Sequence, residues 1–88
     1  MKQRVVSSSD RQPICAVFGK VVREERSRLD LTLSALAQLT GLSRQCISAV
    51  EKGRKVPNLD TVARLAGAFG VDPATLLIRA RRRLRSRA

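Results

Sequence analysis

The chain contains no histidine, no tryptophan and no tyrosine, and it has only two cysteines and two phenylalanines among 88 residues. Histidine is the commonest general base and a common metal ligand, so its absence argues against acid–base catalysis. Two separated cysteines without histidine do not supply the four ligands of a zinc site. The sequence therefore predicts a protein that is not an enzyme and that uses no metal and no cofactor.

Long apolar runs are also missing. No segment approaches the ~20 apolar residues that span a bilayer, and the opening residues MKQRVVSSSDRQ lack the apolar stretch of a signal peptide. We therefore expect a cytoplasmic protein in which Cys15 and Cys46 are free thiols. Apolar residues make up 43% of the chain, a proportion typical of a folded domain. A chain of this length is enough for one small domain.

Acidic residues are scarce. The chain has seven Asp and Glu residues and 18 Lys and Arg residues, which gives a net charge of +11. Residues 79–88 contain six Arg and no acidic residue. A field of this sign attracts polyanions: nucleic acid, an acidic membrane surface or an acidic protein. An aromatic content of 2% argues against single-strand binding, which uses stacking on aromatic rings. No membrane partner is expected, because the Arg-rich tail lacks aromatic anchors.

Hydrophobic periodicity predicts a first helix that begins at Pro13 and runs to about residue 29, preceded by a flexible basic arm over residues 1–12. Apolar residues in this segment recur at spacings of 3, 4 and 7, the period of one buried helix face. They are Ile14, Val17, Phe18, Val21, Val22 and Leu29.

Four more short helices are predicted from capping residues and helix breakers. They are expected over residues 33–40, 43–52, 59–69 and 73–85. The caps and breaks are Asp30, Thr32, Gly41, Ser43, Gly53, Asn58, Gly70 and Pro73. The predicted fold class is all-α, with a five-helix domain over residues 13–78 and an Arg-rich C-terminal extension over residues 79–88.

Residues 33–53 have the pattern of a helix-turn-helix: two short helices joined by a turn that contains glycine. When the second helix is wound at about 100° per residue, Ile47 and Val50 fall on one side, towards the core. Cys46 lies at the edge of that side and is interpreted as a small core-edge residue, with a redox switch as the alternative. The opposite side holds Arg44, Gln45, Ser48, Ala49 and Lys52.

This outer side has the chemistry of a DNA-reading helix. Arginine can donate two hydrogen bonds to guanine, glutamine can pair with adenine, and serine can reach a base or a phosphate. Arg44, Gln45 and Ser48 are therefore candidate base contacts. A basic loop and the N-terminal ends of helices favour phosphates. The corresponding candidate phosphate contacts are Arg54, Lys55, Thr32 and Asn58.

Residues 18–77 resemble the Cro/C1-type (Xre-family) helix-turn-helix domain of phage repressors and bacterial regulators. The resemblance rests on SALAQLTGLS, I-S-x-x-E-x-G, P-x-L-x-T and AGAFGV. It implies a lambda-repressor-like fold whose third helix enters the major groove of double-stranded DNA. It also implies that Ser43 and Lys52 face phosphates, and that Arg26 and Glu51 form a partly buried structural ion pair.

Two positions depart from the family pattern. Leu33 stands where the family commonly has a glutamine that touches DNA, so this residue either meets a thymine methyl group or packs against the protein. Asp30 stands at a turn that often carries glycine, and aspartate tolerates the left-handed backbone conformation.

The sequence thus predicts a nucleoid-associated transcriptional regulator, such as a repressor, that binds a palindromic operator as a homodimer. Leu76, Leu77 and Ala80 are the predicted dimer contact, with the Arg run exposed. One alternative is an antitoxin whose main act is to bind a partner toxin, with operator binding secondary. Another is a non-specific nucleic-acid binder driven by the Arg tail. A further protein partner, such as RNA polymerase, remains open.

Overall fold

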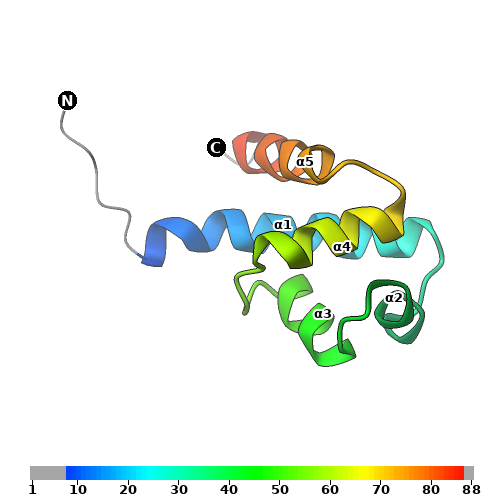
Figure 1. Cartoon of the computed structure of the whole chain (residues 1–88). Coiled ribbons are helices and arrows are strands. Elements are labelled where there is room, and N and C mark those ends of the chain that lie inside the picture. The colour runs from blue at the N-terminus through cyan, green and yellow to red at the C-terminus, as the bar shows by residue number, and fades with distance from the viewer. Residues whose placement is uncertain (1–7, 87–88) are drawn as a thin grey trace.

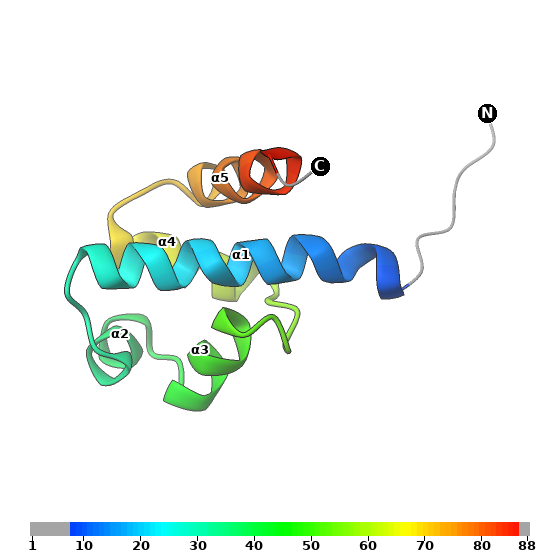
Figure 2. The ribbon, with the colours of Figure 1, turned by 180° about the vertical axis from the view of Figure 1, so that it is seen from behind.

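The computed structural model describes residues 8–86, and their side chains from residue 13 onwards. It contains α1 (Ser8–Arg28), α2 (Leu33–Thr40), α3 (Arg44–Glu51), α4 (Leu59–Phe69) and α5 (Pro73–Ser86). No strand occurs in the described range, so the predicted all-α fold with five helices is confirmed. The long α1 runs through the middle, with α2 and α3 on one side and α5 on the other (Figures 1 and 2).

α1 begins at Ser8, five residues before the predicted start at Pro13. Proline favours the first turn of a helix because it lacks an N–H donor, and for that reason the sequence placed the start there. In the structure Pro13 lies inside α1, where it removes one helical hydrogen bond. Of the predicted arm, residues 8–12 are therefore helical, and residues 1–7 lie outside the described part of the chain.

The predicted N-caps are confirmed. The Oγ1 atom of Thr32 accepts from the N–H of Ala35 at 3.0 Å, and Oγ of Ser43 accepts from the N–H of Cys46 at 3.0 Å. Asn58 caps α4 through Oδ1 in the same way. Each such cap contributes about 1 kcal/mol. The tight turns follow the prediction as well, since Gly41, Gly53, Gly70 and Asp30 all have positive φ.

The core is formed where α1 packs against α3, α4 and α5, while α2 packs against α3 and α4. Fully burying one aliphatic side chain contributes about 1.5–3 kcal/mol. The largest fully buried side chains are Leu36, Ile47, Leu65, Leu76, Val17, Val22 and Val50. The predicted inner face of α1 is correct except at its end, where Leu29 is 37% exposed. Glu25, which is 5% exposed, continues that inner face instead.

The predicted dimer contact on α5 is wrong for two of its three residues. Leu76 and Ala80 are fully buried in the core of the single chain, so they are not free to meet a second copy. They lie one helical turn apart and therefore share the inner face of α5. Leu77 lies outside this inner face, and its side chain is 46% exposed.

Within the described part of the chain, no single helix is long and apolar enough to cross a membrane. α4 and α5 meet that test only when taken together, and they are bent by 99° relative to each other.

Candidate nucleic-acid interface

α3 lies directly on the backbone of α1 because a glycine permits the contact. A Cβ atom added at Gly19 would stand 2.3 Å from the carbonyl oxygen of Val50 and 2.6 Å from that of Glu51. No side chain of any size fits this space unless the helices separate. Gly53, just after α3, approaches Ala16 of α1 almost as closely, since its Cβ would lie 3.1 Å from Cα of Ala16. The two glycines set the depth at which α3 sits on α1.

An ion pair fixes the same two helices side by side. Nε of Arg26 donates to Glu51 at 2.7 Å and Nη2 donates at 3.2 Å. Nη1 of Arg26 also donates to the carbonyl oxygen of Leu31, at 2.9 Å. The hydrogen bonds to Glu51 hold the pKa of Arg26 above its ordinary value. The structure therefore contains the pair that the family resemblance implies, with side chains only 17% and 8% exposed.

α2 packs against α4, and hydrogen bonds hold its C-terminal end in place. Nη1 of Arg64 donates to the carbonyl oxygen of Thr40 at 2.9 Å, which satisfies a carbonyl at the end of α2. The buried hydroxyl of Thr40 donates to the carbonyl oxygen of Leu36 at 2.8 Å. It also accepts from the N–H of Leu42, which begins the turn to α3. Arg64 could not be recognised from the sequence, because this contact depends on the packing of α4 against α2.

The outer side of α3 is open. Ile47 and Val50 are buried on its inner side, as predicted. Arg44, Gln45 and Lys52 are exposed, and the remaining outer residues are half-buried. Together with one residue of α2 and one of the following loop they line a shallow depression that contains no acidic side chain. Its lining residues are Leu33, Arg44, Gln45, Ser48, Ala49, Lys52 and Arg54.

Two basic side chains at or beside this depression contact neighbouring residues. Nη1 of Arg44 donates to Oγ of Ser34 at 3.1 Å, so the guanidinium lies between α3 and the start of α2. Ser34 was not predicted as a site residue. Its position next to Leu33, in the first helix of the helix-turn-helix, could have indicated it. Lys55 lies on the flank of α3, where its Nζ is 3.4 Å from Sγ of Cys46.

The three capping residues among the candidates do not line the depression. The side-chain oxygens of Thr32, Ser43 and Asn58 are occupied as N-caps of α2, α3 and α4. Any phosphate at these helix ends would therefore meet backbone N–H groups. Leu33 is half-buried and packs against the core. It also lines the depression. Cys46 is half-buried and Cys15 buried, and both are free thiols.

Residues 17–77 match a family model described as a helix-turn-helix domain. The match covers well over half of the chain, and the chain belongs to this family. The resemblance to Cro/C1-type domains is thereby confirmed. The matched range contains α2, α3 and α4 completely, together with the part of α1 on which α3 packs.

Three similar proteins illustrate the family. An uncharacterized HTH-type transcriptional regulator of Methanothermobacter thermautotrophicus is 46% identical over 50 residues, which are 57% of this chain and 72% of that protein. Another, MT0491 of Mycobacterium tuberculosis, is 31% identical over 62 residues; these are 70% of this chain but only 44% of that longer protein. The crystal structure of the restriction-modification controller protein C.AhdI from Aeromonas hydrophila has a TM-score of 0.68 at 34% identity, covering 70% of this chain and 94% of that chain.

These relatives agree with the class of protein that the sequence predicts. Two carry the description of an HTH-type transcriptional regulator and the third is a controller protein. The predicted class, a DNA-binding helix-turn-helix regulator and not an enzyme, is confirmed at this level.

Proposed function

We propose that the chain is a sequence-specific double-stranded DNA-binding transcriptional regulator that acts as a homodimer on a palindromic operator, with α3 in the major groove. The observation that carries this proposal is the open, acid-free outer side of α3. An α-helix with side chains is about 10–12 Å wide, and the major groove of B-DNA is about 12 Å wide. Binding to DNA associates the protein with the nucleoid.

Arg44, Gln45 and Ser48 contact base edges. They are neighbours in one depression, and their donors and acceptors suit the major-groove edges of guanine and adenine. Arg44 exchanges its hydrogen bond with Ser34 for the base, which costs little because both groups are exposed. Leu33 at the rim offers an apolar surface that suits a thymine methyl group.

The sugar-phosphate backbone is held by Lys52, Arg54 and Lys55. All three are exposed and follow the reading residues directly in the chain. Backbone N–H groups at the N-terminal ends of the helices capped by Thr32, Ser43 and Asn58 add further phosphate contacts. Such contacts orient a protein on the duplex without reading its sequence.

The proposed homodimer contact consists of Val56 and Leu59, because burial removes Leu76 and Ala80 from the contact expected on α5. These side chains are 54% and 84% exposed, so both are free to meet a second copy. Val56 lies in the loop that follows α3 and Leu59 is the first residue of α4, so a second copy bound there would lie beside the C-terminal end of α3. An isologous contact of this kind matches the twofold symmetry of a palindromic site.

Selection from a random duplex pool tests the function. Full-length protein is expected to enrich a sequence with two inverted half-sites whose centres are about 34 Å apart, one turn of DNA. Enrichment of no sequence above the starting pool would contradict a sequence-specific regulator. Enrichment of a single half-site without symmetry would contradict the dimer.

Lys55→Ala is expected to weaken binding to every duplex, because the lysine contacts phosphate and not bases. The slope of log affinity against log salt should flatten by about one, the value for one lost phosphate contact. Titrations at several salt concentrations measure the slope. Lys20→Ala, which removes an exposed lysine of α1, is the matched control and should keep the slope. An unchanged slope in Lys55→Ala would remove this residue from the interface.

A further inference from the structure

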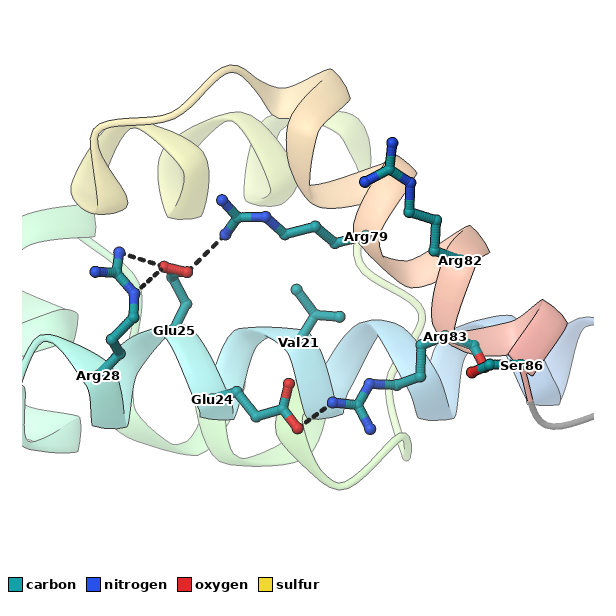
Figure 3. Close-up of a pocket in the computed structure, with 8 residues that line it drawn as sticks. All are labelled: Val21, Glu24, Glu25, Arg28, Arg79, Arg82, Arg83 and Ser86. Atoms are coloured by element: carbon teal, nitrogen blue, oxygen red, sulfur yellow. Dashed lines mark hydrogen bonds and ion pairs between the residues drawn. The ribbon is translucent and has the colours of Figure 1, made fainter.

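α5 is held against α1 by ion pairs as well as by its buried apolar residues. Glu25 accepts from Nε of Arg28 at 2.8 Å and from Nη1 of Arg79 at 2.6 Å, and Glu24 pairs with Arg83 (Figure 3). The hydrogen bond from Arg28 holds the pKa of Glu25 below its ordinary value, against the opposite effect of burial. Two of the arginines of α5 are thus used inside the fold.

A second set of α5 residues, here called the α5 outer face, has no such use. Its members are all exposed and recur on one side of the helix at spacings of three and four. They are Ala74, Leu77, Ile78, Arg81, Arg82 and Arg85. Leu77 is 46% and Ile78 is 48% exposed. The three arginines form no ion pair with an acidic side chain of residues 13–86, and Figure 3 shows Arg82 pointing away from α1.

The α5 outer face has an apolar part and a basic part in contact. Ile78 lines one shallow groove together with Arg81, Arg82 and Arg85. Arg81 and Arg85 are one helical turn apart, and like charges at this spacing destabilise an isolated helix. The fold does not need this repulsion, because α5 is already held by its inner residues. The arrangement therefore suits a ligand that neutralises the arginines and covers the aliphatic side chains.

The position of α5 rules out the operator as that ligand. α3 and α5 lie on opposite sides of α1 in both views (Figures 1 and 2). A duplex along the outer side of α3 is therefore remote from the arginines of α5 in the same subunit. Contact of Arg81, Arg82 and Arg85 with the phosphates of an operator bound to α3 of the same subunit does not fit this geometry.

We propose that the α5 outer face binds an acidic amphipathic helix of a partner protein. Carboxylates of the partner would pair with Arg81, Arg82 and Arg85, since the planar guanidinium matches a carboxylate with two hydrogen bonds. Leucine-like side chains of the partner would cover Leu77 and Ile78. A nucleic-acid backbone has no apolar surface to cover them. A second copy of the chain would bring arginine against arginine, which is unfavourable.

A labelled synthetic peptide tests this binding surface without DNA. The probe is a helical peptide of alanine, leucine and glutamate, with leucines at i, i+3, i+4 and i+7 and glutamates along both borders of that stripe. A peptide of the same composition in shuffled order is its control. By fluorescence anisotropy near physiological salt, the patterned peptide should bind about tenfold more tightly than the shuffled one, a difference of about 1.4 kcal/mol.

Variants of the protein locate the binding. Arg82→Glu and Ile78→Ser should each lower the affinity for the patterned peptide about tenfold. Arg23→Glu makes the same change in net charge as Arg82→Glu at an exposed position of α1, and it should leave the affinity within about twofold of wild type. Circular dichroism of each variant confirms that it is folded. A ternary complex of chain, peptide and duplex DNA is also expected, because the two faces are opposite.

Four results would overturn the proposal. Equal binding of both peptides, or equal losses in Arg82→Glu and Arg23→Glu, would mean that only net charge acts. Displacement of the peptide by random-sequence duplex would make the α5 outer face a nucleic-acid surface. Loss of self-association in Ile78→Ser would assign it to a second copy of the chain. Since the peptide assay contains no DNA, a failure of operator recognition would not change its outcome.

Discussion

Gly19→Ala is expected to lower the free energy of unfolding by about 3 kcal/mol, the upper end for an overpacked core site. The added Cβ would stand 2.3 Å and 2.6 Å from two backbone carbonyl oxygens of α3, and backbone atoms cannot rotate away as a side chain can. α3 must therefore move off α1. For a domain of this size such a loss lowers Tm by roughly 12–24 °C, which thermal unfolding followed by circular dichroism measures.

Gly67→Ala is the matched control, because it makes the same chemical change in an open place. A Cβ at Gly67 meets no atom within 4 Å, and the residue lies inside α4. Alanine favours a helix interior over glycine by about 0.5–1 kcal/mol, so this variant should be more stable than wild type. Equal stability changes in the two variants would contradict the close contact between α1 and α3.

Glu51→Ala is expected to lower the free energy of unfolding by about 3 kcal/mol, as for a broken buried ion pair. The change leaves the guanidinium of Arg26, whose side chain is 17% exposed, without its carboxylate. Only the hydrogen bond from Arg26 to Leu31 remains. Because Glu51 is the last residue of α3, the variant should also weaken DNA binding by loosening that helix. Urea unfolding measures the first effect.

Asp60→Asn serves as the comparison for this ion pair. Asp60 pairs with Arg64 at 2.8 Å, but the two side chains are 70% and 47% exposed. An exposed pair contributes about 0–1 kcal/mol, so this variant should lose little stability. If Glu51→Ala lost no more than Asp60→Asn, the pair between α1 and α3 would act as an ordinary surface pair.

Much of the fold could be predicted from local sequence signals. Thr32, Ser43 and Asn58 each precede a helix and cap it, because the capping hydrogen bond spans only three residues. The outer side of α3 could be predicted from the helical period alone. Once Ile47 and Val50 face the core, the polar residues of this helix must lie on the opposite side. For the same reason the open face of the candidate site was predictable.

Other features depend on contacts between distant segments. On α5 two helical stripes contain aliphatic residues, one through Leu76 and Ala80 and one through Leu77. Periodicity does not say which stripe packs against α1, and the structure buries the first. Glu25 could not be recognised as buried because Arg79, one of its partners, is 54 residues away. The placement of Arg44 against Ser34 likewise depends on how α2 packs beside α3.

The most direct test of the account is the binding of wild type and Arg44→Ala to the selected operator and to its single-base-pair variants. The outer side of α3 is proposed to read base edges, so Arg44→Ala should lose about 1–3 kcal/mol on the operator. It should also lose its preference at one position of each half-site and keep the others. An equal loss on every duplex, with all base preferences kept, would contradict the account and assign Arg44 to the phosphate backbone.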